Sequence, residues 1–257
     1  MANLGTCKLC QTANVEICAS HVIPEFFYKK IYTSSHKFTA VAKDSCEQLT
    51  VEQKGYRERL LCLSCETKLS KWEGKLSQLT NEITSDSYVT CTATKVLNVL
   101  VVNEIDYLNV KLAILSIFWR LSVATHRLFS GYDLGPYAEE FRQILDQRRM
   151  LSDTDFPVIL SKGILEGSFQ SGILLPVGRG RYDKSLIMQS VVLNGIVFDC
   201  FMTSTKSIPE EVLAFSLQPS GRALLSSRPY EELGMNVGDF SERMKKQDVK
   251  SFFARHA

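Results

Sequence analysis

Two closely spaced cysteine pairs constrain this sequence more than any other feature. Cys7 and Cys10 form the first C-x2-C pair, and Cys62 and Cys65 form the second. A C-x2-C turn brings two thiolates within reach of one metal ion, and two such turns complete a tetrahedral four-cysteine zinc site. Such a site has no open position, so we expect the zinc to stabilise the fold and not to carry chemistry. The alternative is a set of unmetallated core thiols.

The composition is that of an ordinary globular protein, with 45% apolar and 23% charged residues in 257. The net charge of +2 means that any nucleic-acid role needs a local basic face. The N-terminal residues lack the regions of a signal peptide, and no run approaches the roughly 20 apolar residues that span a bilayer. We therefore expect a cytoplasmic protein without a membrane partner. In that reducing compartment the cysteine pairs favour zinc over a disulfide or a thiol-redox role.

The first predicted unit, residues 1–82, is organised around the cysteine pairs. Its predicted elements are a strand at 15–18, a helix at 24–32, a hairpin of strands 38–41 and 48–51, and a helix that begins at Cys65. The last helix is indicated by apolar side chains at helical spacing, Leu69, Trp72, Leu76 and Leu79. A polar linker is expected at 81–87.

The second predicted unit, residues 83–257, changes from helices to strands. Its predicted elements are a β-rich stretch at 88–102, a helix at 107–129 capped by Asp106, a helix that begins at Pro136, strands at 173–177 and 222–227, and a short helix at 209–213. Asn194-Gly195 between two β-rich runs predicts a hairpin. A solvated basic helix is expected at 238–257. The fold class is therefore α+β, with a zinc-stabilised N-terminal unit, then helices, then a mainly antiparallel β region.

The order of motifs in the first unit resembles the zinc-containing branch of the HNH endonucleases, the His-Me finger fold. The matching segments run from Cys7 to Glu66 and are Cys7-x2-Cys10, Ser20-His21-Val22-Ile23-Pro24 and Leu61-Cys62-x2-Cys65-Glu66. The resemblance implies a treble-clef, ββα-metal fold. It also implies that His21 is a general base that activates water against a phosphodiester, assisted by Mg²⁺ or Mn²⁺ at a site separate from the zinc.

Three positions depart from the family pattern. Ser20 replaces the acidic residue before the histidine, Arg57 stands where an asparagine is expected, and Glu66 replaces the final histidine or asparagine. Glu58 lies beside Arg57, and carboxylates are good ligands for magnesium or manganese. We therefore expect either a variant catalytic site made of His21, Glu58 and Glu66, or an inactive one.

Each of these residues also has a structural interpretation. Cys18-x2-His21 offers a rival metal-ligand pair, and a further alternative is that His21 only hydrogen-bonds the cysteine turn. Glu66 suits the start of a helix, where the macrodipole favours a carboxylate. Glu58 can simply pair with a neighbouring arginine.

Basic residues around the first unit suggest a nucleic-acid contact. The candidates are Arg57, Arg59, Lys68 and Lys71, with Lys75 continuing the helical spacing of the two lysines. The predicted function is an HNH-like endonuclease or a nuclease-derived nucleic-acid-binding protein, and DNA is favoured over RNA. The alternative is a catalytically inactive zinc-scaffolded module in which residues 83–257 engage a protein partner or a small ligand.

Overall fold

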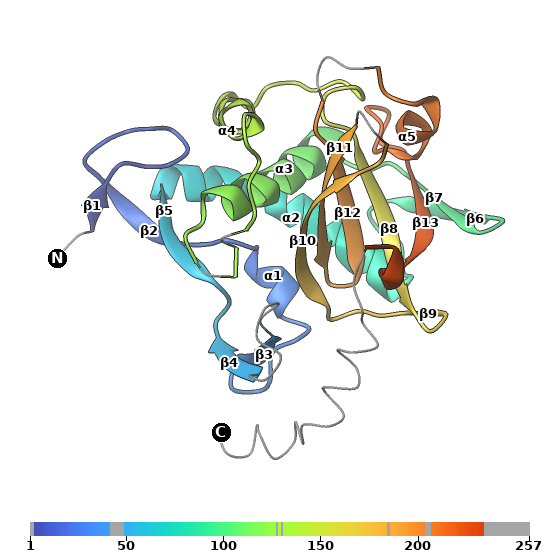
Figure 1. Ribbon diagram of the computed structural model, residues 1–257, viewed down its shortest axis with the longest axis horizontal. Helices are drawn as coiled ribbons and strands as arrows, with labels where there is room; N and C mark the ends of the chain where they lie inside the picture. The colour runs from blue at the N-terminus through green and yellow to red at the C-terminus, as the bar shows by residue number, and fades with distance from the viewer. Residues whose placement is uncertain are drawn as a thin grey trace.

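The structure is a computed structural model that describes residues 3–41, 49–126, 128–129, 131–183, 186–203 and 207–233 (Figure 1). Within these ranges the protein is a mixed α+β fold. The helices are α1 (Glu25–Tyr28), α2 (Leu63–Ser85), α3 (Tyr107–Val123), α4 (Tyr137–Gln147) and α5 (Glu210–Phe215), with a short 3-10 helix at Tyr230–Leu233. The predicted basic helix at 238–257 lies outside the described residues.

A three-stranded sheet and the long helix α2 form the N-terminal part. The strands are β1 (Leu4–Gly5), β2 (Val15–His21) and β5 (Arg57–Cys62), in the order β1-β2-β5 with antiparallel pairing. The predicted hairpin is confirmed as β3 (Lys37–Val41) and β4 (Leu49–Gln53), which are inserted between β2 and β5. The predicted helix at 24–32 ends earlier, because α1 covers only Glu25–Tyr28.

Helix α2 directly follows β5 and is longer than predicted. The predicted apolar stripe is buried, and Thr80, Glu82 and Ile83 continue the buried face beyond it. The helix therefore runs through part of the expected 81–87 linker. It ends where Asp86 adopts a left-handed conformation with φ of 53°.

Helix α3 occupies the centre of the molecule and packs against α2 and α4 (Figure 1). Its predicted cap is confirmed, since the Asp106 carboxylate accepts a hydrogen bond from the Asn109 N–H. The helix ends at Val123 and not at 129, because Ala124 is already extended. Most of its residues are buried, so it forms the main internal support of the fold.

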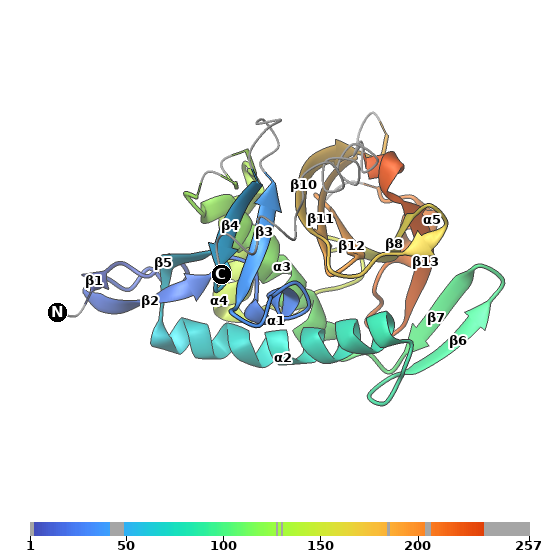
Figure 2. The ribbon, with the colours of Figure 1, turned by 90° about the horizontal axis from the view of Figure 1, so that it is seen from below.

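An eight-stranded sheet makes up most of the C-terminal part. Its strands follow the order β10-β11-β12-β8-β13-β7-β6, with β9 (Ser168–Phe169) paired to β8. They are β6 (Thr92–Val96), β7 (Val99–Asn103), β8 (Val158–Leu165), β10 (Leu174–Arg181), β11 (Ile187–Leu193), β12 (Ile196–Phe201) and β13 (Ala223–Pro229). The pairing is antiparallel except between β13 and β8, which are parallel. Figure 2 shows that β10, β11, β12, β8 and β13 follow a curve, whereas the β6–β7 hairpin projects outward.

The Asn194-Gly195 hairpin between β11 and β12 is confirmed. Both residues have positive φ, 55° for Asn194 and 82° for Gly195, as a tight turn between antiparallel strands requires. Gly195 cannot be replaced easily, because an added Cβ would lie 2.1 Å from the Gln170 carbonyl oxygen.

One hydrophobic core runs through both predicted units. It includes Leu69 and Leu76 of α2, Trp119 of α3 and Phe198 of the large sheet. Helix α2 itself crosses the predicted boundary at residue 82. Among the described helices, none has the length and apolar character needed to cross a membrane.

Candidate functional site

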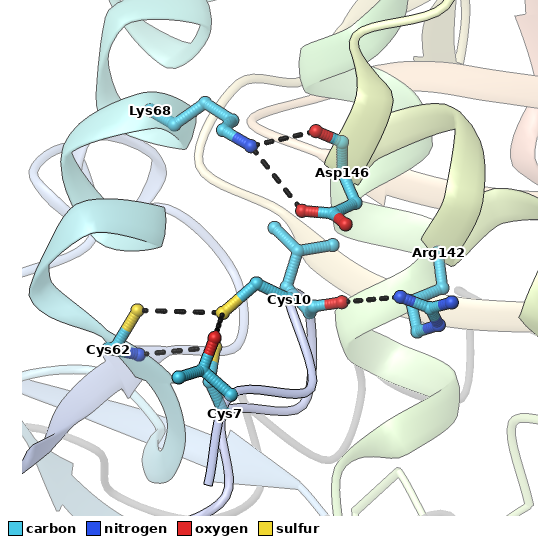
Figure 3. Close-up of polar contacts among 8 residues, drawn as sticks. Cys7, Cys10, Cys62, Lys68, Arg142 and Asp146 are labelled. Atoms are coloured by element: carbon cyan, nitrogen blue, oxygen red, sulfur yellow. Dashed lines mark hydrogen bonds and ion pairs between the residues drawn. The ribbon is translucent and has the colours of Figure 1, made fainter. Parts of the chain in front are cut away.

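The four predicted cysteines meet at one point. Their Sγ atoms all lie within 4.8 Å of one another. Cys7 and Cys10 come from the turn before β2, Cys62 ends β5, and Cys65 lies in the first turn of α2. The Cys62 backbone N–H donates to Cys7 Sγ over 3.3 Å, and the Sγ atoms of Cys10 and Cys62 are 3.9 Å apart (Figure 3). The arrangement is compatible with a metal site.

The thiols of this cluster are not equivalent. Burial raises the pKa of Cys7 and of Cys65. Burial also opposes ionisation of Cys10, but hydrogen bonds with Thr12 prevail and lower the pKa of Cys10 to about 7. A group of close thiols, three of them buried, is costly to ionise unless a cation compensates the charge. The donor set therefore fits a metal ion better than it fits free thiolates.

Helix α4 holds the cysteine turn from the C-terminal side. Arg142 Nη1 donates to the Leu9 carbonyl oxygen over 2.7 Å, between the two cysteines of the first pair (Figure 3). Lys68 of α2 donates to the Asp146 carbonyl oxygen at 2.9 Å and lies 3.5 Å from the Asp146 carboxylate. Lys68, predicted as a nucleic-acid contact, is thus engaged within the protein. The contacts of α4 could not be predicted from the sequence, because their partners are more than 70 residues apart.

His21 and Arg57 form a pair at the end of the β2–β5 ladder. They are directly opposite each other in the register, and Arg57 Nε donates to His21 Nε2 over 2.9 Å. The same Nε2 atom lies 3.3 Å from the Lys54 carbonyl oxygen. Nε2 accepts from Arg57 when the imidazole proton is on Nδ1, and it donates to Lys54 when the proton is on Nε2. Arg57 also lies 3.7 Å from the Glu25 carboxylate, and its side chain is 38% exposed. The pair therefore has one face open to solvent.

The surroundings of His21 favour the neutral form of its imidazole. Burial lowers the pKa of His21 below its usual value, and the positive charges of Arg57 and Arg120 act in the same direction. Glu25 and the contact with the Lys54 carbonyl oxygen oppose this shift. The charges that act most on His21 thus come from Arg57, Glu25 and Arg120, and neither Glu58 nor Glu66 is among them.

Glu58 is bound to the end of helix α3. Its two carboxylate oxygens accept hydrogen bonds from the Thr125 and His126 backbone N–H groups and the Thr125 hydroxyl, at 2.8–3.0 Å. These N–H groups follow the last turn of α3, so Glu58 fixes the chain where the helix ends. Its partner is this backbone segment and not the neighbouring arginine expected as the structural alternative.

Glu66 lies beside Cys18, on the first turn of α2. Its negative charge raises the pKa of Cys18, after the larger effect of burial, and its Oε1 atom is buried without a hydrogen-bond partner among the described residues. The structure therefore places Glu58 against α3 and Glu66 against Cys18. The group of four metal-type ligands found in the described part of the chain includes neither Cys18 nor His21.

The remaining predicted basic residues differ in their surroundings. Arg59 of β5 is exposed to solvent, and its Nη1 donates to the Ile17 carbonyl oxygen over 3.0 Å. Lys71 and Lys75 are exposed on α2. The other exposed residues between 64 and 78 of this helix are uncharged: Ser64, Thr67, Ser70, Gly74 and Gln78. This exposed surface of α2 is therefore positive.

Two residues that were not predicted from the sequence, Arg120 and Glu73, support the backbone at His21. Arg120 of α3 donates from Nη1 to the His21 carbonyl oxygen over 2.8 Å, and from Nη2 to the Glu73 carboxylate over 2.5 Å. Arginine is almost never fully buried without a partner, so an arginine within an apolar helical run is unusual. This position was the sequence signal that Arg120 has a specific partner. Its partners could not be inferred, because Glu73 and His21 are 47 and 99 residues away.

No family model matches this chain, and no curated protein or solved structure shows a significant match to it.

Proposed function

We propose that this protein is a zinc-scaffolded, HNH-like nucleic-acid-binding protein in which His21 and Arg57 contact a phosphate of the backbone. The pairing of His21 with Arg57, at 2.9 Å and open to solvent, carries this proposal. A guanidinium that retains free N–H groups is well suited to a phosphate, and its planar fork can donate two parallel hydrogen bonds. The phosphate would compete with Glu25 and His21 for Arg57.

The proposed zinc is held by Cys7, Cys10, Cys62 and Cys65. Four sulfur ligands within 4.8 Å of one another are the donor set that structural zinc prefers, and zinc would contribute folding energy there and not catalysis. The order of elements supports a treble-clef arrangement, since a cysteine turn precedes a strand pair and a helix supplies the last ligands. The HNH resemblance of Cys7 to Glu66 is consistent with this order.

The exposed lysines of α2 extend the proposed surface. Lys71 and Lys75 are one helical turn apart and would follow a phosphate backbone by charge alone. No base-reading group is evident among these residues, so we expect binding with little sequence preference. The net charge of +2 implies that this binding depends on the local surface and is weakened by salt.

Phosphodiester hydrolysis is the second candidate, and the lowered pKa of His21 favours it. A neutral imidazole can accept a proton from water, and movement of Arg57 toward a phosphate would release the Nε2 lone pair that Arg57 now occupies. The engaged carboxylate of Glu58 and the position of Glu66 weigh against a Mg²⁺ or Mn²⁺ site beside His21. We therefore place binding before catalysis.

One panel of assays separates the two functions. The protein is incubated with labelled single-stranded DNA, duplex DNA or RNA, with Mg²⁺, Mn²⁺ or EDTA, and both anisotropy and strand cleavage are followed. Binding without cleavage supports the first proposal. Cleavage that is lost in His21→Gln supports the second. Failure to bind any of the three nucleic acids at low salt contradicts both.

A further inference from the structure

Arg120 lies beneath the His21–Arg57 pair and is only 1% exposed. It reaches from the last turn of α3 to the carbonyl oxygen of His21, at 2.8 Å, and it is neutralised by Glu73 at 2.5 Å. Ser116, one turn earlier on α3, accepts two further hydrogen bonds from Arg120, one at its carbonyl oxygen and one at its hydroxyl oxygen, each over 3.3 Å. We propose that Arg120 is a positioning residue that sets the orientation of the His21 imidazole through the His21 main chain.

The contact acts where the strand pairing ends. His21 is the last residue of β2, and the only further backbone bond of this ladder that the described residues show is from the Val22 N–H to the Tyr56 carbonyl oxygen. Pro24, which has no N–H, follows two residues later. Rotation of the peptide after His21 would turn the imidazole away from Arg57. The Arg120 guanidinium opposes that rotation because it holds the carbonyl oxygen in one direction.

A second contact from the same end of α3 holds the partner strand. Glu58, next to Arg57 on β5, accepts hydrogen bonds from the Thr125 and His126 backbone N–H groups. One end of α3 thus binds β2 through Arg120 and β5 through Glu58. The distance and angle between His21 and Arg57 are therefore fixed from the C-terminal part of the chain.

Stability alone is a poor explanation for the Arg120–Glu73 pair. Removing two charges from water is costly, and well-packed apolar residues of similar volume are often at least as stable as a buried ion pair. An apolar pair would lose the hydrogen bond to the His21 carbonyl. The positioning role accounts for a guanidinium at this buried position, because its planar fork can bind Glu73 and the carbonyl at once.

The test uses nuclear magnetic resonance of the full chain labelled with ¹⁵N-histidine. The sequence contains only four histidines, so a His21→Gln variant assigns the His21 signals. The wild-type protein should show the Nδ1–H tautomer that the Arg57 contact requires. In the neutral double variant Arg120→Met/Glu73→Gln, His21 should become a mixture of tautomers, and its pKa should rise toward the usual value.

Two comparisons make the test specific. Glu73→Gln alone retains the Arg120 contact to the His21 carbonyl and should keep the wild-type tautomer. Arg149→Met/Glu140→Gln makes the same chemical change at a surface ion pair on and beyond α4, away from His21, and should also leave the tautomer unchanged. Circular dichroism and thermal unfolding confirm that each variant is folded.

Arg120→Lys decides the question if the double variant does not fold. The lysine keeps a cation opposite Glu73 but has no fork with which to hold both partners, so it should lose the wild-type tautomer. A folded Arg120 variant in which His21 keeps the tautomer and pKa of the wild type would overturn the proposal. The functional importance of His21 rests on the proposed function. The tautomer measurement does not, because the nuclear magnetic resonance signals of His21 can be recorded even if the protein binds no nucleic acid.

Discussion

Arg57 donates from Nε to Nε2 of His21 across β2 and β5, and the two atoms are 2.9 Å apart. In the Nδ1–H tautomer this contact occupies the lone pair that a general base would use. It also places a guanidinium, the side-chain group best suited to phosphate, beside an imidazole whose pKa is lowered. Binding and any catalysis at this site are therefore linked through the position of Arg57.

The pKa of His21 has a predictable effect on stability. Because burial and Arg57 lower the pKa in the folded protein, the unfolded chain binds a proton at a higher pH than the folded chain does. The free energy of unfolding should therefore fall as the pH is lowered from about 6.5 toward the folded-state pKa. Urea unfolding between about pH 7 and pH 5 measures this, with His21→Gln as the reference. Identical pH dependence in the two proteins would contradict the lowered pKa.

Glu58 is predicted to act as a helix-end clamp and not as a metal ligand. Glu58→Gln replaces a charged acceptor of several hydrogen bonds and should lower the free energy of unfolding by about 2 kcal/mol. Glu16→Gln makes the same change at an exposed position of β2 and should have little effect. If Mg²⁺ or Mn²⁺ raised the melting temperature of the wild type but not of Glu58→Gln, Glu58 would instead be a metal ligand.

Loss of one cysteine ligand should abolish zinc binding and lower the stability of the fold. Cys10→Ser is expected to abolish stoichiometric zinc binding and to lower the melting temperature by roughly 10 °C or more, because structural zinc is coupled to folding. Cys18→Ser is the matched control, since Cys18 lies outside the four-cysteine cluster. Elemental analysis and thermal unfolding report the two effects. Equal zinc content and melting temperature in both variants would exclude the proposed site.

Lys111 of α3 should make the protein more stable at alkaline pH. Its amino group is fully buried, donates to the Ser152 carbonyl oxygen over 2.8 Å, and has a pKa lowered by burial to about 8. The folded protein therefore loses this proton before the unfolded chain does, and stability should rise between about pH 8 and pH 10.

The comparison with Lys111→Met isolates this effect from the tyrosines that titrate in the same range. The stability of the wild type relative to the variant should increase by up to about 3 kcal/mol across this range. Lys75→Met, at an exposed position of α2, provides the reference for loss of a lysine charge. A constant difference between the wild type and Lys111→Met would show that the buried amine does not titrate there.

Features governed by local chemistry were predictable from the sequence. The C-x2-C spacing predicted a cluster of Cys7, Cys10, Cys62 and Cys65, Asp106 predicted the start of α3, and Asn194-Gly195 predicted the turn between β11 and β12. In each case the signal lies within a few residues, and the physical cause is a turn or a cap.

Features governed by distant contacts were not predictable. Strand β8 lies in the interior of the large sheet, but residues 158–165 include Ser161, Lys162 and Gly163 and do not show a clear apolar pattern. The end of α3 depends on Glu58, which is 67 residues away in sequence. Pairing between distant segments is decided by the packed core, and no local rule in a single sequence reports it.

The salt dependence of nucleic-acid binding tests the central proposal most directly. Anisotropy titrations of the wild type with labelled DNA should give a binding constant that falls with salt, and Arg57→Gln should weaken binding and reduce the slope of log K against log [salt] by about 1. Arg149→Gln removes the same charge at an exposed position away from the site and should leave both quantities nearly unchanged. Equal affinity and equal slope for Arg57→Gln and the wild type would contradict a phosphate contact at the His21–Arg57 pair.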